Sequence, residues 1–256
     1  MTKTVLITGA TAGIGEACAQ LFAAHQYRLI LTGRRKDRLD KLSQQLMIRH
    51  DVAVRSLVMD VRNRKAVSDA LESLPASWKE VDVLINNAGL CLGLDPLQLG
   101  NPDDWDTMID TNIKGLLYVT RTVSQWMVKR NSGHIINLGS IAAKETYPNG
   151  NIYCATKHAV DSLSKAMRID LLPCGVKVTA IHPGPAETEF SQVRFKGDLA
   201  RAKKVYEGYQ ALTAQDIAET IWFAVSRPAH VNISDLLIMP AAQATATIVH
   251  RKSASQ

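Results

Sequence analysis

The sequence predicts an α/β protein with a doubly wound sheet of seven parallel strands and helices on both faces. Short apolar or β-branched runs alternate regularly with helical patterns along the 256 residues. Parallel strands need helical crossovers, so this alternation indicates a parallel sheet covered on both sides. With 46% hydrophobic residues, a chain of this length can bury one sizeable core. We therefore expect a single domain over residues 1–256.

Seven short runs rich in Val, Ile and Leu are the predicted strands. They are residues 4–8, 28–32, 52–59, 81–85, 134–138, 176–181 and 235–239. Between them, apolar residues recur at three- and four-residue steps, as on one face of a helix. The clearest helical patterns cover residues 39–46, 67–74, 105–127 and 153–171.

One segment departs from the alternation. Residues 184–214 are polar, charged and poor in strand signals, and a long excursion of this kind after a strand usually forms a lid or a binding loop. The stretch TAQD at 213–216 then predicts a capping box that opens another helix. After Pro240 the chain is small and polar, which leaves a loose end or an oligomer contact open.

Composition excludes several classes of protein. The chain has no apolar run long enough to span a bilayer, and its N-terminus lacks the profile of a signal peptide. Its four cysteines stand singly, which fits packing thiols in a reduced cytoplasm. The seven histidines show no metal-ligand spacing, so we expect no metal. The net charge of +6 suits a phosphorylated cofactor as well as nucleic acid, and no aromatic-rich basic stretch favours nucleic acid.

A glycine-rich loop follows the first predicted strand. Gly9, Gly13 and Gly15 lie between this strand and a helix, in TVLITGATAGIGEA. In a Rossmann-like unit such glycines permit a tight turn, backbone approach to a pyrophosphate and close helix packing. The helix N-terminus adds free N–H groups and a positive dipole. A plain turn is the alternative, but the order strand, loop, helix favours nucleotide binding.

The end of the second predicted strand is basic. An NAD site usually places an acid here for the ribose hydroxyl, whereas Gly33 is followed by Arg34 and Arg35, and the first acid is Asp37. Two guanidinium groups can bind a 2′-phosphate, which an acid would repel. A solvated helix start is the alternative. The position at the strand's carboxyl end favours NADP over NAD.

A serine, a tyrosine and a lysine follow the fifth predicted strand. Ser140 comes directly after HIINLG, Tyr153 lies thirteen residues later, and Lys157 is one helical turn beyond Tyr153. Together with TGATAGIG, NNAG at 86–89 and Asn112 in DTNIKG, these residues resemble the short-chain dehydrogenase/reductase family. The resemblance extends from Val5 to about Met239, and the motifs occur in order and at matching spacing.

This resemblance implies a catalytic tetrad of Asn112, Ser140, Tyr153 and Lys157. Tyr153 would be the acid/base, with its pKa brought toward working pH by the charges of Lys157 and of the oxidised nicotinamide. Ser140 would donate to the substrate oxygen and, with Tyr153, bind the substrate. Lys157 would also bind the nicotinamide ribose. Asn112 would hold a water of the proton relay in a bent stretch of the long helix; a satisfied buried amide is the alternative.

The resemblance also implies an NADP-binding shell. Its residues would be Gly9, Thr11, Gly13, Ile14, Gly15, Arg34, Arg35, Asp60, Val61, Asn87, Tyr153, Lys157, Pro183, Gly184 and Thr188. Pro185 is unusual after Gly184, because it removes an N–H that could contact the cofactor.

The closer resemblance is to the NADP-dependent 3-hydroxy acid dehydrogenases, which act on serine and allo-threonine. TGRRKDRL, TEFSQVRFKGD and PAHVNISDLLIMP are among the stretches that carry it. It implies a cytoplasmic homotetramer with a small-molecule substrate. Arg194 is the candidate for binding the substrate carboxylate, and a solvated residue or an ion pair with Glu189 or Asp198 is the alternative.

Two other functions stay open at this point. A carbonyl or 3-oxoacyl reductase of the same family would share the tetrad and differ in the substrate pocket. A non-catalytic NADP-sensing protein would keep the glycine loop and could lose the tetrad, which is intact in this sequence.

Overall fold

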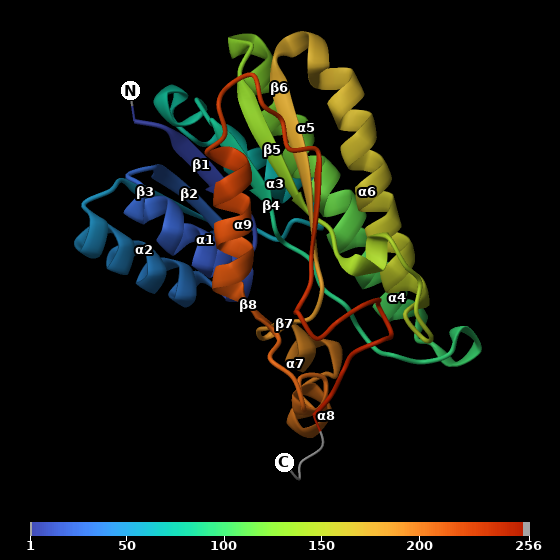
Figure 1. Cartoon of the computed structure of the whole chain (residues 1–256). Coiled ribbons are helices and arrows are strands. Elements are labelled where there is room, and N and C mark those ends of the chain that lie inside the picture. The colour runs from blue at the N-terminus through green and yellow to red at the C-terminus, as the bar shows by residue number, and fades with distance from the viewer. Residues whose placement is uncertain (1, 253–256) are drawn as a thin grey trace.

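A parallel sheet forms the centre of the computed structural model, which describes residues 2–252 (Figure 1). Within these residues seven strands lie in the order β3-β2-β1-β4-β5-β6-β9, and every neighbouring pair is parallel. The strands are β1 Thr4–Ile7, β2 Arg28–Gly33, β3 Val54–Val58, β4 Val83–Asn86, β5 Gly133–Leu138, β6 Val176–Pro183 and β9 Asp235–Ile238. The doubly wound sheet of seven parallel strands is therefore confirmed.

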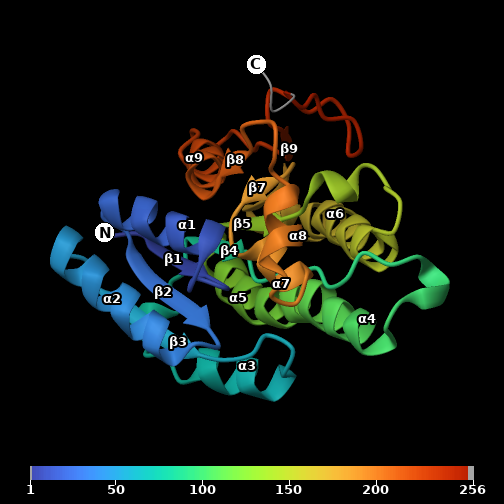
Figure 2. The same ribbon diagram turned by 90° about the horizontal axis from the view of Figure 1, so that it is seen from below.

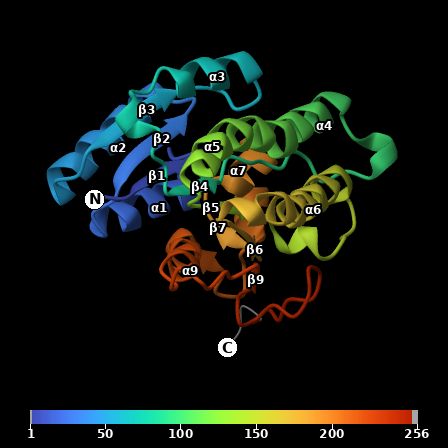
Figure 3. The same cartoon turned by 90° about the horizontal axis from the view of Figure 1, so that it is seen from above.

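Helices cover both faces of the sheet (Figure 3). One face carries α1 Gly13–Ala24, α2 Lys36–His50 and α9 Ala214–Val225. The other carries α3 Arg64–Glu72, α5 Leu116–Arg130 and α6 Asn151–Leu171. Short 3₁₀ turns lie at Ala76–Trp78, Leu97–Leu99, Ile141–Ala143 and Leu172–Cys174.

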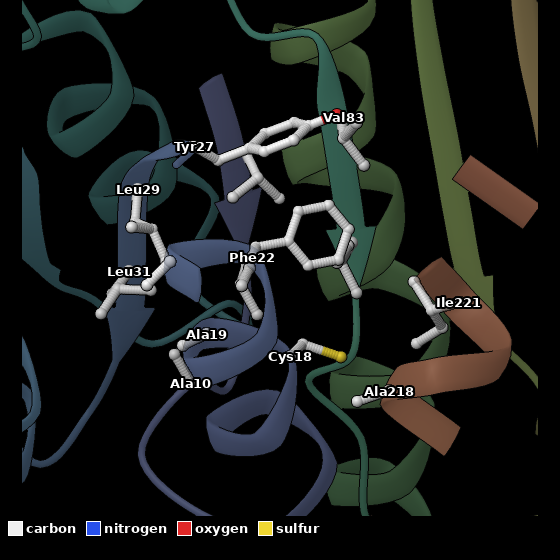
Figure 4. Close-up of a cluster of buried hydrophobic side chains, with 14 of the residues drawn as sticks. Ala10, Cys18, Ala19, Phe22, Tyr27, Leu29, Leu31, Val83, Ala218 and Ile221 are labelled. Carbon is white, nitrogen blue, oxygen red and sulfur yellow. The ribbon is translucent and has the colours of Figure 1, made fainter. Parts of the chain in front are cut away.

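The core beneath α1 and α9 is built around Phe22. Figure 4 shows this ring on α1 between Val83 of β4 and Ile221 of α9. All three side chains are buried, and the Phe22 ring also meets Tyr27 edge to face, with 5.1 Å between ring centroids. This packing fixes α1, and with it the glycine loop, against the sheet.

The long helical pattern over 105–127 is interrupted by a wider turn. Helix α4, Pro102–Ile109, passes through a π-helical turn at Asp110–Gly115 before α5 begins. A π-turn holds one extra residue and bends the helix locally. Gly115 is required there, because a β-carbon at this position would lie 2.7 Å from Val61. Asn112 is inside this turn, as expected for the bent stretch.

Residues 184–214 lie at the carboxyl edge of the sheet (Figure 2). They contain a two-stranded ribbon, β7 Ala186–Glu187 and β8 Leu212–Thr213, and two short helices, α7 Phe190–Arg194 and α8 Leu199–Lys204. The predicted capping box is confirmed: Thr213 Oγ1 accepts from the Asp216 N–H, and the Thr213 N–H donates to the Asp216 carboxylate.

The chain after Pro240 packs against the body of the protein, so the interpretation as a loose end is wrong for residues up to 252. The Ala246 N–H donates to the Glu145 carboxylate at 2.7 Å, and the Lys252 N–H donates to the Gly208 carbonyl at 2.7 Å. None of the helices within residues 2–252 is both long and apolar enough to cross a membrane.

Candidate active site

The predicted site residues gather at one edge of the sheet. Since the strands are parallel, the segments that follow them meet at their carboxyl ends. The glycine loop follows β1, NNAG spans the end of β4, and Ser140 follows β5. The chain order reverses between β1 and β4, and such a switch point opens a crevice for ligands.

Tyr153 and Lys157 lie one turn apart on α6 and are almost fully buried, with 8% and 6% of their surfaces exposed. Lys157 Nζ donates to the carbonyl of Leu138 at 2.8 Å and lies 5.9 Å from the centre of the Tyr153 ring. Leu138 ends β5, two residues before Ser140. This hydrogen bond therefore ties the lysine to the strand that delivers the serine.

Burial sets the protonation of this pair. It raises the pKa of Tyr153 well above the usual range of a phenol, while hydrogen bonding with Ser140 and the charge of Arg194 act in the opposite direction. The ring of Phe190, at the start of α7, covers Tyr153 with 5.7 Å between centroids. Burial also lowers the pKa of Lys157 to about 8. In the protein alone Tyr153 is thus a neutral phenol and Lys157 a cation at pH 7.

Asn112 is a buried amide with several protein partners. Its Nδ2 donates to the Leu90 carbonyl at 2.8 Å and to Thr156 Oγ1 at 3.0 Å, and its Oδ1 accepts from the Leu90 N–H at 2.9 Å. A β-carbon on Gly89 would lie 3.3 Å from Asn112 Oδ1 and 3.6 Å from Lys157 Nζ. The glycine therefore keeps free the space between these two polar atoms.

A partly buried ionic cluster, which the sequence did not reveal, contacts the backbone of Ser140 through His182. His182 of β6 directs Nδ1 toward the Ser140 carbonyl at 3.3 Å and Nε2 toward Asp235 at 3.0 Å. Lys144 donates to Asp235 at 2.8 Å and to Asp161 at 2.9 Å. Within residues 2–252, one group of side chains has donor atoms close enough together to bind a metal ion, namely Asp161, His182 and Asp235. The ammonium of Lys144 pairs with both carboxylates of this group and provides a positive charge there.

The glycine loop has the backbone geometry of a phosphate cradle. Gly9 and Gly13 have φ angles of +66° and +54°, in the left-handed region that favours glycine. A β-carbon on Gly15 would lie 2.4 Å from the Gly9 carbonyl oxygen, so α1 reaches the loop only without a side chain there. The Asn87 amide donates to the carbonyls of Thr8 and Gly9 at 2.9 and 3.1 Å, which holds the loop in place.

The basic residues after β2 have different surroundings and partners. Arg34 is exposed at the end of the strand. Arg35 donates to Thr11 Oγ1 at 2.9 and 3.1 Å, so it joins the glycine loop to the second strand. It also pairs with Glu189 at 2.9 Å, and Arg38 pairs with the same carboxylate at 2.7 Å.

Two residues of the predicted NADP-binding shell, Asp60 and Val61, lie after β3. Asp60 accepts from its neighbour Arg62 through both carboxylate oxygens. Val61 is buried and rests on Gly115 of the π-turn. Ile14, in the first turn of α1, packs against the core beneath that helix.

The segment after β6 runs back over the glycine loop. The Gly184 N–H donates to the Ile238 carbonyl at 2.7 Å, so β9 extends its pairing beyond Pro183. Pro185 offers only its carbonyl, which accepts from the Leu212 N–H at 3.1 Å. Thr188 rests against Gly13, where a β-carbon would lie 3.2 Å from the threonine Cβ.

Arg194 lies against Tyr147 rather than in solvent. Its Nε donates to the Gly93 carbonyl and its Nη2 to the Tyr147 hydroxyl, both at 3.3 Å. Glu189 pairs instead with Arg35 and Arg38, so the suggested Glu189 ion pair is not formed. Next to Arg194, a cavity of about 20 Å³ lined by residues that include Gly93 and Tyr153 has room for about one water.

Comparisons with known proteins identify the family. The model of the short chain dehydrogenase family matches residues 3–198. This chain therefore belongs to the short-chain dehydrogenases.

Two relatives and one solved structure resemble this chain over nearly its whole length. The chain is 50% identical over 249 residues to the NADP-dependent 3-hydroxy acid dehydrogenase YdfG of Salmonella typhi, covering 96% of this chain and 99% of the relative. It is 45% identical to sulfoacetaldehyde reductase 2 of Chromohalobacter salexigens, covering 95% and 96%. A solved closed form of serine dehydrogenase complexed with NADP⁺ superposes with a TM-score of 0.90 at 48% identity, covering 97% and 100%.

The depressed pKa of Lys157 predicts a pH-dependent stability. Its pKa is about 8 in the folded protein and 10.5 ordinarily, so below pH 8 folding buries a full charge. Between these values only the unfolded chain keeps the proton, and stability rises with pH. The variant Lys157→Met has no charge to bury, so its folding does not carry this free-energy cost. Denaturant titrations should show the stability of the variant relative to the parent improving by about 2–3 kcal/mol from pH 10 to pH 7.

The difference between variant and parent cancels the titration of groups that are distant from Lys157. A difference that stays constant over this pH range would mean that the buried ammonium carries no such penalty.

Proposed function

We propose that this protein is an NADP-dependent oxidoreductase that transfers a hydride between the nicotinamide and the hydroxyl-bearing carbon of a small 3-hydroxy acid. Serine, allo-threonine and similar compounds are the proposed substrates. The observation that carries the proposal is the buried Tyr153–Lys157 pair beside Ser140, at the sheet edge that also holds the glycine loop. The names of the YdfG and serine dehydrogenase relatives support the substrate class.

The residues present fit NADP. Gly9 and Gly13 form a backbone cradle, and the Gly15 position admits no side chain. Arg35 and Arg38 already hold an anion, the Glu189 carboxylate, at the end of β2 where a 2′-phosphate is expected. Thr11, Ile14, Arg34, Asp60, Val61, Asn87, Pro183, Gly184 and Thr188 complete the proposed shell. When bound, the oxidised nicotinamide supplies the hydride acceptor and a positive charge.

The chain's own residues manage the proton. We assign Tyr153 to take the proton from the substrate hydroxyl as the carbon is oxidised, and Ser140 to donate a hydrogen bond to the same oxygen. The ammonium of Lys157 favours the phenolate and is placed to bind the nicotinamide ribose. Asn112 Oδ1 accepts one hydrogen bond and has a second lone pair. The space beside Gly89 would admit a relay water between Asn112 and Lys157.

The organisation of the whole molecule belongs to the same proposal. We assign residues 1–256 to a single catalytic domain in which residues 184–214 act as the substrate lid. The cavity of about 20 Å³ beside Tyr153 is too small for a hydroxy acid. Phe190 of this segment covers Tyr153, with 5.7 Å between ring centroids, so a movement of the segment would open the tyrosine to the substrate. A cytoplasmic homotetramer, without nucleic acid or membrane partners, is the proposed state.

A carbonyl or 3-oxoacyl reductase is the second candidate, because it would use the same tetrad. Sulfoacetaldehyde reductase 2 is an example of a relative whose name gives a carbonyl substrate. A non-catalytic NADP-sensing protein is disfavoured, since all four tetrad residues are present and three of them are nearly buried at one site.

Turnover assays test the function directly. With NADP⁺, we expect NADPH absorbance to appear with β-hydroxy acids, and far more slowly with alcohols. Acyl thioesters and aromatic ketones are tested with NADPH.

Tyr153→Phe should abolish turnover while NADPH binding, followed by fluorescence, stays near normal. Tyr27→Phe removes another buried phenol, in the core beneath α1, and serves as the control. Substantial activity in Tyr153→Phe would refute the proposed proton transfer.

A second prediction concerns the carboxylate of the substrate. Arg194 already directs its guanidinium to Gly93 and Tyr147 at the cavity beside Tyr153. Arg194→Lys should lower kcat/KM for serine-like acids, and Arg194→Ala should lower it further. The loss of a charge-assisted contact in Arg194→Ala corresponds to about 1.5–3 kcal/mol of transition-state stabilisation. An uncharged alcohol should be nearly unaffected.

The matched control is Arg201→Ala, which removes an arginine of the same segment that stacks on Phe195, 4.6 Å from the ring centroid. Equal losses for charged and neutral substrates would make Arg194 a structural residue of the lid, with the carboxylate bound elsewhere.

A further inference from the structure

One carboxylate of the 184–214 segment is held by two guanidinium groups from the start of α2. Glu189 accepts from Arg35 at 2.9 Å through one oxygen and from Arg38 at 2.7 Å through the other. In sequence these partners are more than 150 residues apart. The contact therefore joins the region after β6 to the region after β2, across the mouth of the glycine loop.

The location of this contact is that of a phosphate site. Arg35 is fixed on the loop by two hydrogen bonds to Thr11 Oγ1, and Thr188 lies against Gly13. A cavity of about 250 Å³ opens beside Arg38, and its lining has two basic side chains and one acidic one: Thr11, Glu16, Arg38, Lys41, Leu42 and Gln45. A carboxylate thus stands where a larger, more highly charged anion would meet the same donors.

The energetics allow this carboxylate to be displaced. Its side chain and those of the two arginines are 41–50% exposed, and ion pairs of such exposure each contribute roughly 0–1 kcal/mol. A phosphate group offers three oxygens and nearly two negative charges to the same guanidinium groups. Hydrogen bonds from Arg38 and Arg35 keep the pKa of Glu189 below its ordinary value, so it is an anion at neutral pH.

We propose that Glu189 is a built-in competitor of the cofactor's 2′-phosphate, and that Arg38 joins Arg35 as a ligand of that phosphate. Binding of the phosphate then takes both arginines from Glu189 and frees the start of α7, which carries Phe190 over Tyr153. Glu189 would in this way lower the affinity for NADP, and not for NAD. The inference rests on the proposed NADP dependence.

Calorimetric titration with two nucleotides tests the inference without turnover. Adenosine 2′,5′-bisphosphate carries the 2′-phosphate, and adenosine 5′-monophosphate differs from it only by that group. Glu189→Gln should bind the bisphosphate about three- to tenfold more tightly than the parent does, as expected for the loss of one or two exposed ion pairs. Its affinity for the monophosphate should stay within about twofold of the parent value.

Glu187→Gln is the matched control, since it removes the same charge from an exposed position two residues away. It should change neither affinity. Arg38→Ala should weaken binding of the bisphosphate alone, and Glu189→Gln should gain less in that background because one contested ligand is gone.

Unchanged or weaker bisphosphate binding by Glu189→Gln would overturn the inference, and so would an equal gain in Glu187→Gln. In the first case Glu189 would hold the two arginines in position for the phosphate. In the second, the affinity would depend only on the net negative charge of this segment and not on the contact of Glu189 with the arginines. A parent protein that binds the two nucleotides equally would contradict the NADP assignment itself, and with it the inference.

Discussion

Parallel strand pairing is the constraint on which the rest of this structure depends. β1 pairs with β2 on one side and β4 on the other, both parallel, and the chain continues outward in each direction. Every strand therefore delivers its following segment to the same edge. Residues as far apart as Gly9, Arg35, Ser140 and Thr188 meet there without any local signal that links them.

Burial then gives this edge its chemistry. Tyr153 and Lys157 lose most of their water, and desolvation alone moves both pKa values toward the neutral forms. The phenol thus stays protonated in the free protein although the Lys157 ammonium lies near it, and a second positive charge is needed to ionise it. The proposed catalytic cycle uses this property: Tyr153 becomes a base only when the oxidised nicotinamide is in place, which protects the free protein from an uncompensated buried anion.

The sequence predicts those parts of the structure that have a local pattern. The strands, the face shared by Tyr153 and Lys157 and the capping box at Thr213 follow from period, spacing or motif. The bend around Asn112 follows from the family resemblance. Contacts between distant residues have no such pattern. The cluster of His182, Lys144, Asp161 and Asp235, and the pairing of Glu189 with Arg35 and Arg38, depend on the path of the folded chain. Asp161 lies one helical turn after Lys157 on α6, and this spacing is the local signal from which the cluster could have been sought.

The ionisation of Tyr153 with and without cofactor tests the central claim most directly. Ultraviolet difference titration of the parent against Tyr153→Phe isolates this phenol. In the free protein we expect its pKa to lie above the ordinary value of 10. NADP⁺ should lower it strongly, while NADPH, whose nicotinamide is neutral, should lower it much less. A phenol that already ionises below 10 in the free protein, or that responds equally to the two cofactor forms, would contradict the account.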